Sequence, residues 1–136
     1  HIFENASSAT ISVFNNDKFE IDSILTSSKE YDIIKFSIQN PKGIKFNYLV
    51  FKTQNPQKGE DIFTIGNPMG LESTVSKGII SNIRDIENLG SLYQITAPIS
   101  AGSSGSPVMN MKGEAIGIAS YKWPKSELCN RCRFCK

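Results

Sequence analysis

Short stretches in which apolar and polar side chains alternate recur along most of this chain. Residues 18–22 and 34–38 both have this period of two, which is typical of a β-strand with one buried face. Turn sequences containing Asn, Pro or Gly separate the stretches. Further strands are expected at residues 9–13, 48–52, 61–65, 74–83, 92–97 and 114–121, and no long segment has a helical period. The pattern predicts an all-β sandwich or barrel.

The bulk composition excludes several classes of protein. The 136 residues are 39% hydrophobic and 21% charged, which is a globular composition of about one domain. A net charge of +2 without a basic run argues against a nucleic-acid partner. No apolar stretch approaches the roughly 18 residues of a membrane span. The three cysteines, Cys129, Cys132 and Cys135, all lie in the last eight residues, so the body of the chain holds no disulfide framework.

One loop carries the residues best suited to chemistry. Residues 99–107 read Ile-Ser-Ala-Gly-Ser-Ser-Gly-Ser-Pro, and the loop lies between apolar runs at residues 92–97 and 107–109. A nucleophilic serine needs an accessible hydroxyl, a sharp backbone turn and N–H groups directed at the developing oxyanion. Glycines on both sides of Ser104 would allow that turn. By itself, the same composition also fits an ordinary flexible Gly/Ser loop.

Several spaced motifs resemble those of the HtrA/Deg family of serine proteases. The family's pattern around its nucleophile, approximately G-N-S-G-G-P, corresponds to residues 102–107, and its G-x-(V/I)-I-G-I corresponds to residues 113–118. Residues 65–71 resemble I-G-N-P-x-G-L, residues 74–81 resemble T-V-x-x-G-I-(I/V)-S, and residues 94–97 resemble Q-T-D-A. The resemblance runs from residue 1 to about residue 121. Two departures are Ser103 in place of Asn and Ser106 in place of the second Gly.

The resemblance implies a catalytic triad in the chain order His, Asp, Ser, as in chymotrypsin-like proteases. Ser104 would be the nucleophile. His1, the single histidine of the chain, opens a segment resembling H-V-(V/I)-(D/E)-N-A and would be the general base. Asp32 opens a segment resembling D-(I/L)-A-(V/L)-(L/I)-K and would orient the base. The backbone N–H groups of Gly102 and Ser104 would form the oxyanion hole.

By the same resemblance, a substrate pocket would be walled by Ile99, Ile118, Ala119 and Ser120. No acidic residue lies among these, so cleavage after small or medium aliphatic residues is expected, because a buried Arg or Lys would be unpaired. The substrates would be unfolded or misfolded polypeptides, and neither a cofactor nor a metal is implied. The family further suggests oligomers and an extracytoplasmic or periplasmic location.

The fold implied is a chymotrypsin-like double β-barrel. Residues up to about 51 would belong to the first barrel, and residues from about 59 to 123 would supply most of the second. Residues 1–123 are thus expected to be a partial peptidase domain, apparently truncated at both ends, because strands should precede His1 and no final strand is recognisable after Tyr121. Alone, such a chain is expected to be inactive and prone to aggregate. Residues 124–136 form a tail of unknown role.

Two other functions remain open at this point. A catalytically inactive relative could bind peptides or proteins, as Ser106 and the terminal position of His1 suggest. Alternatively, the tail cysteines could begin a zinc ribbon, and the chain would be a metal-dependent interaction module. Only three thiols are present, whereas a structural zinc site takes four ligands.

Overall fold

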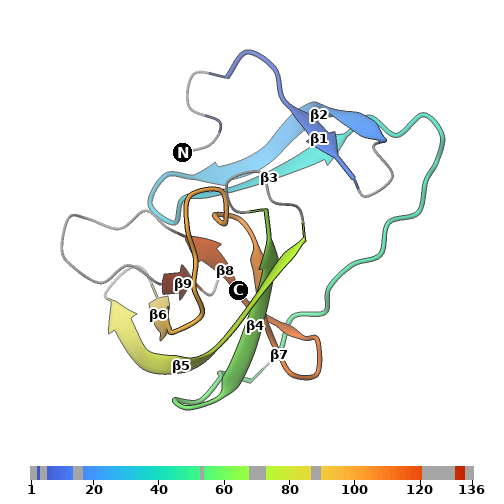
Figure 1. The fold of residues 1–136 in the computed structure, drawn as a ribbon. Helices are drawn as coiled ribbons and strands as arrows, with labels where there is room; N and C mark the ends of the chain where they lie inside the picture. Colours follow the sequence, from blue (N-terminus) through green and yellow to red (C-terminus); the bar gives the residue numbers. More distant parts are fainter. Residues whose placement is uncertain are drawn as a thin grey trace. The chain divides into compact units, whose positions relative to one another are not determined.

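A computed structural model describes residues 3, 6–13, 17–52, 54–67, 73–86, 90–120 and 131–133, the last three by their backbone. The chain divides into two compact units, His1–Asn47 and Tyr48–Lys136. Every regular element in the described residues is a β-strand (Figure 1). The all-β class predicted from the period of two is therefore confirmed.

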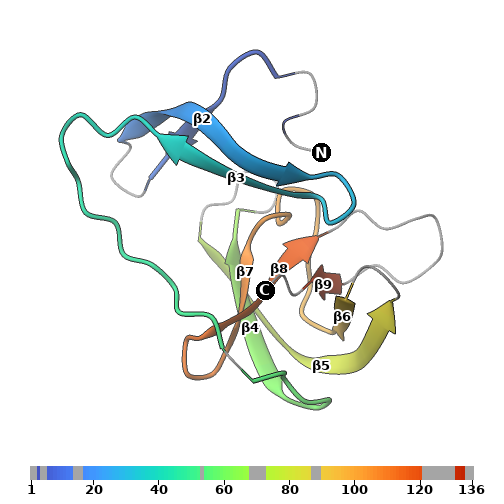
Figure 2. The ribbon, with the colours of Figure 1, turned by 180° about the vertical axis from the view of Figure 1, so that it is seen from behind.

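The first unit contains an antiparallel sheet in the order β1-β2-β3 (Figure 1), and Figure 2 shows its two long strands, β2 and β3, from behind. These strands are β1 (Thr10–Ser12), β2 (Lys18–Ser28) and β3 (Ile33–Ile38). The alternation at residues 18–22 buries Phe19 and leaves its charged neighbours exposed. The Phe19 ring meets Phe46 edge to face, with centroids 5.2 Å apart. Such aromatic pairs are worth about 0.5–1.5 kcal/mol beyond the area they bury.

The second unit contains a closed barrel in the order β4-β5-β6-β9-β8-β7. The strands are β4 (Asp61–Gly66), β5 (Thr74–Ile86), β6 (Gly90–Ile95), β7 (Pro107–Asn110), β8 (Ala115–Ser120) and β9 (Arg131–Arg133). Each neighbouring pair is antiparallel. Closure gives each of these six strands a neighbour on both sides, so none of them is an edge strand.

The core of the second unit fills the interior of this barrel. Its buried members are Ile62, Ile80, Tyr93, Ile95, Ala97, Ile99, Val108, Ile116 and Ala119. Full burial of one such large aliphatic side chain contributes about 1.5–3 kcal/mol. A small residue is required where β5 meets the segment that follows β6. A Cβ on Gly78 would collide with the backbone N of Ala97 and lie 2.7 Å from its Cα.

The final strand of the second barrel corrects an expectation from the sequence. No final strand was predicted after Tyr121, and that prediction was wrong, because β9 closes the barrel. Within β9, Arg133 pairs with Leu92 on one side and with Ile118 on the other. The strand has only three residues, so it is too short to show an alternating pattern. Backbone pairing to the edges of β6 and β8, which needs no particular side chain, defines it instead.

Residues 48–52 were predicted to form a strand, and this was also wrong. Only Phe51 makes an isolated parallel bridge, to Ala115. The Lys52 N–H donates to the Ala115 carbonyl at 2.9 Å, and the Ala115 N–H donates to the Val50 carbonyl at 2.8 Å. The segment's large side chains are exposed, Tyr48 by 86%, so its apolar composition reflects neither a strand nor a core position.

Candidate active site

The loop between β6 and β7 is built from two consecutive tight turns. The Ser103 N–H donates to the Ser100 carbonyl at 2.9 Å, and Gly102 at the third position has a φ of 93°. The Ser106 N–H donates to the Ser103 carbonyl at 3.1 Å, and Gly105 has a φ of 91°. A positive φ only at the third position defines a type II turn, which strongly favours glycine there. The positive φ at Gly102 and Gly105 therefore explains why glycine stands at both positions of the predicted motif.

Hydrogen bonds to the barrel fix this pair of turns. The Gly105 N–H donates to the Ala119 carbonyl at 2.9 Å, and the Ala119 N–H donates to the Ser106 carbonyl at 2.8 Å. On the other side, the Thr64 hydroxyl donates to the Pro107 carbonyl at 2.8 Å. The loop is therefore tied to both β8 and β4, and its shape follows from the barrel.

Ser103, the first departure from the family's pattern, has a structural role within the first turn. Its side chain is only 6% exposed. Its Oγ accepts a hydrogen bond from the Ser100 N–H at 3.4 Å, while its own N–H closes the same turn. The small polar side chain therefore satisfies a backbone donor inside the loop, which makes serine compatible with this position.

Ser104 occupies the second position of the second turn, at the corner of the loop, and is half-buried. The bonds that close the two turns are donated by Ser103 and Ser106, so the Gly102 N–H is not needed to hold the first turn. An arrangement with a hydroxyl at a fixed corner and an N–H two residues earlier suits nucleophilic attack on a carbonyl with stabilisation of the oxyanion.

Asp32 lies in the turn immediately before β3 and is half-buried. Its φ is 54°, in the left-handed region where aspartate is tolerated better than most other residues. The preceding Tyr31 N–H donates to the Ser28 hydroxyl at 3.2 Å. Asp32 belongs to the first unit and Ser104 to the second. The predicted base, His1, lies outside the described residues.

The four predicted pocket residues fall into two groups. Ile99 and Ala119 are 8% and 2% exposed and belong to the core of the barrel. Ile118 and Ser120, which lie on β8, are half-buried. Within the described residues no group bonds to the buried Oγ of Ser120. A polar atom of this kind normally requires a partner.

The tail cysteines contribute little to the described structure. Cys132 lies in β9, whereas Cys129 and Cys135 are outside the described residues. In the part of the chain that the structure describes, no three His, Cys, Asp or Glu side chains cluster as metal ligands would. Nor does that part contain a helix with the length and apolarity needed to cross a membrane.

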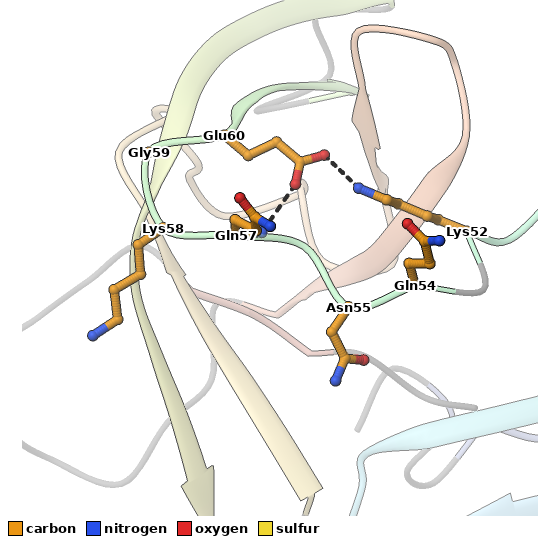
Figure 3. A pocket seen from close by; sticks show the side chains of 7 residues that line it. All are labelled: Lys52, Gln54, Asn55, Gln57, Lys58, Gly59 and Glu60. Atoms are coloured by element: carbon orange, nitrogen blue, oxygen red, sulfur yellow. Dashed lines mark hydrogen bonds and ion pairs between the residues drawn. The ribbon is translucent and has the colours of Figure 1, made fainter.

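A hollow of about 480 Å³ lies elsewhere on the second unit, lined by residues between 52 and 60 (Figure 3). Lys52 Nζ donates to Glu60 Oε1 at 2.8 Å, and the Gln57 N–H donates to Glu60 Oε2 at 3.0 Å. Burial alone would raise the pKa of Glu60, but the bonds from Lys52 and Gln57 outweigh it and lower this pKa. No residue of the Ser104 loop lines this hollow, and its ion pair stabilises a turn.

The sequence flagged Ser106 as a departure but not the residue it contacts. A Cβ on Gly66 would lie 2.5 Å from the Ser106 Oγ and 3.5 Å from the Ser106 Cβ. The end of β4 and the end of the Ser104 loop are therefore in direct contact. Both residues stand in motifs that the sequence singled out separately, and nothing in either motif indicates that they meet.

Comparisons with known proteins agree with the sequence motifs and the barrel. A family model described as the trypsin-like peptidase domain matches residues 1–118. The chain is 33% identical over 122 residues to the periplasmic serine endoprotease DegP of Salmonella typhimurium, covering 87% of this chain and 25% of DegP. It is 31% identical over 123 residues to the periplasmic pH-dependent serine endoprotease DegQ of Escherichia coli, covering 87% and 26%. It thus spans about a quarter of the length of these curated relatives.

Solved structures share the fold at lower identity. The HtrA-type protease AlgW with a decapeptide superposes with a TM-score of 0.81 at 22% identity, over 98% of this chain and 42% of AlgW. An inactive serine-to-alanine mutant of Rv3671c from M. tuberculosis gives 0.78 at 17% identity, over 98% and 68%. The chymotrypsin-like β-barrel fold predicted from the resemblance is confirmed.

Proposed function

This chain belongs to the trypsin-like peptidase family and is HtrA/Deg-like within it, and from that premise we propose that it carries serine endopeptidase activity with Ser104 as the nucleophile. The observation that carries the proposal is the pair of type II turns around Ser104. Gly102 and Gly105 have the left-handed φ that these turns require. Bonds to Ala119 hold the loop in place, so the backbone at Ser104 and the Gly102 N–H have a fixed relation to each other.

The proposed reaction is acyl transfer from a peptide to water. Ser104 Oγ attacks the carbonyl carbon while His1 takes the hydroxyl proton, and the N–H groups of Gly102 and Ser104 stabilise the oxyanion. When the C–N bond breaks, His1 returns the proton to the leaving amine. Water then hydrolyses the acyl-enzyme with His1 again acting as the base. Asp32 orients the imidazole and stabilises its protonated form.

The proposed substrates are unfolded or misfolded polypeptides outside the cytoplasm, acted on by an oligomer. The relatives named DegP and DegQ are periplasmic serine endoproteases, which supports the reaction and the location. Cleavage after small or medium aliphatic residues is proposed because Ile99, Ile118 and Ala119 offer no charge to a basic side chain.

The test is covalent labelling of the whole protein by a fluorophosphonate, together with casein hydrolysis. Ser104→Ala should abolish labelling and lower kcat by several orders of magnitude while the far-ultraviolet circular dichroism stays unchanged. Ser81→Ala is the matched control, because Ser81 is an exposed serine on β5. Full labelling of the Ser104→Ala variant would end the proposal.

A second test asks whether the three residues act as one unit. His1→Ala and Asp32→Asn should each reduce kcat greatly, and neither should reduce it much further in a protein that already carries Ser104→Ala, since triad members are not additive. An inactive peptide-binding module, the alternative, would show no labelling of the wild type and unchanged peptide affinity in all three variants.

A further inference from the structure

Gly66 must be small because of its neighbour and not because of its own backbone. Its φ lies outside the left-handed region, so an L-residue could adopt this conformation without strain. The constraint is the Ser106 hydroxyl, whose Oγ would lie 2.5 Å from a Cβ on Gly66. The next contacts, 3.5 Å to the Ser106 Cβ and 3.7 Å to the Ser103 Cα, are ordinary van der Waals distances.

Ser106 is also the residue that closes the turn around Ser104. Its N–H donates to the Ser103 carbonyl, and its carbonyl accepts from the Ala119 N–H. A displacement of Ser106 would therefore move the fourth residue of a turn whose second residue is Ser104. These bonds hold the backbone on both sides of Ser106, so its hydroxyl can leave the place beside Gly66 only by rotation of the side chain.

We propose that Ser106 is a positioning residue, whose hydroxyl packs in the space left by Gly66 and thereby holds the turn that carries the Ser104 hydroxyl. The inference rests on the proposed peptidase function. Positions 66 and 106 share one small volume: glycine with serine fits as it stands, whereas alanine with serine fits only if the Ser106 hydroxyl rotates out of its present place. The serine that departs from the family's pattern is accommodated because β4 ends in a glycine beside it.

The experiment is a double-mutant cycle in the whole protein, with the rate of fluorophosphonate labelling as the readout. Gly66→Ala should slow labelling roughly two- to tenfold, since the Ser106 hydroxyl must rotate out of its place against Gly66 and no longer supports the turn. Ser106→Ala alone should slow it only a few-fold, by loosening the turn. The double variant should label faster than Gly66→Ala alone, because the contact with Oγ, the one sub-van-der-Waals contact of this Cβ among the described residues, is gone.

Peptide kinetics separate positioning from general damage. For Gly66→Ala, kcat should fall while KM changes less than about threefold, because the loop is displaced and the substrate walls are not. The control is Gly78→Ala, whose clash is with the backbone of Ala97; Ser106→Ala should not rescue it. If Gly66→Ala fails to unfold cooperatively, Ser106→Ala must restore that transition.

The outcomes distinguish the two hypotheses. A wild-type protein that is never labelled contradicts the proposed function. A labelled wild type whose Gly66→Ala variant reacts at the same rate, or is not improved by Ser106→Ala, overturns the role of Ser106 and leaves the peptidase proposal intact.

Discussion

Replacing Glu60 by glutamine tests how the second unit is held together where the chain enters the barrel. The two oxygens of the Glu60 carboxylate have separate donors, Lys52 Nζ at 2.8 Å and the Gln57 N–H at 3.0 Å. An amide has one oxygen, so Glu60→Gln can keep only one of these bonds and loses the charge. The side chain keeps its shape, so the change removes one hydrogen bond and the charge without altering the packing.

The expected loss follows from the exposure of the pair. The Lys52 and Glu60 side chains are 20% and 21% exposed, so the pair is neither a surface pair nor a fully buried one. Surface ion pairs contribute about 0.2–1 kcal/mol, and hydrogen bonds to charged groups about 1.5–3 kcal/mol. Glu60→Gln should therefore lower the free energy of unfolding by about 1–2 kcal/mol at pH 7.

The pH dependence identifies the cause. Folding lowers the pKa of Glu60 below its ordinary value of 4.5, so the ionised group stabilises the fold above that value. The contribution is lost as the pH falls through the folded pKa. In urea titrations followed by circular dichroism, the difference between wild type and Glu60→Gln should be full at pH 7 and should shrink as the pH falls below 4.5. Glu20→Gln, at an exposed position on β2, is the control. An equal difference at pH 3 and pH 7 would refute the electrostatic account.

Three further predictions concern catalysis and the barrel. If His1 is the base, kcat/KM should rise with pH through about 6.5, and a flat profile from pH 5 to 8 would argue against a histidine. A peptide library should show cleavage after small or medium aliphatic residues, because Ile99 and residues 118–120 carry no acid; a preference for Arg or Lys would contradict this. Gly78→Ala should destabilise the fold by about 3 kcal/mol in urea titrations, since its Cβ would meet the backbone of Ala97, and a change below about 0.5 kcal/mol would mean that the strands can separate there at little cost.

The sequence predicted the strands whose side chains alternate. Phe19 is buried between exposed charged neighbours in β2, as its pattern indicates. The expected strand at residues 61–65 is β4, and the one at residues 74–83 begins β5 correctly but ends three residues early. In each case one face of the strand packs and the other does not, and burial of that face leaves a period of two in the sequence.

The elements that were mispredicted owe their structure to the backbone or to tertiary contacts. Arg131–Arg133 completes the barrel by pairing with β6 and β8. Backbone pairing of three residues does not require alternating apolar and polar side chains. Residues 48–52 have the composition of a strand, but only the backbone around Phe51 pairs, with Ala115. Composition therefore does not distinguish a segment that pairs along its length from one that pairs at a single residue.

The turn around Ser104 could be predicted from the sequence, but the hydrogen bonds that hold it could not. The spacing of Gly102, Ser104 and Gly105 suffices to predict a turn with a serine at its corner, because positive φ values are concentrated at glycine. The bonds from Ala119 and Thr64 that hold this turn leave no comparable pattern, since they involve backbone carbonyls and a hydroxyl distant in sequence. Family resemblance alone suggested the roles of His1 and Asp32.

Two requirements of the proposed reaction, oxyanion stabilisation and proton transfer, depend on residues from different parts of the chain. The shape of the loop around Ser104 depends on hydrogen bonds within the second unit, to Ala119 on β8 and from Thr64 on β4. The proposed base and acid come from the segment before Asn47, which belongs to the first unit. Oxyanion stabilisation and proton transfer therefore depend on different parts of the chain. A substitution such as Asp32→Asn should impair proton transfer and leave the contribution of the Gly102 N–H, because an oxyanion hole still accelerates hydrolysis when a triad member is lost.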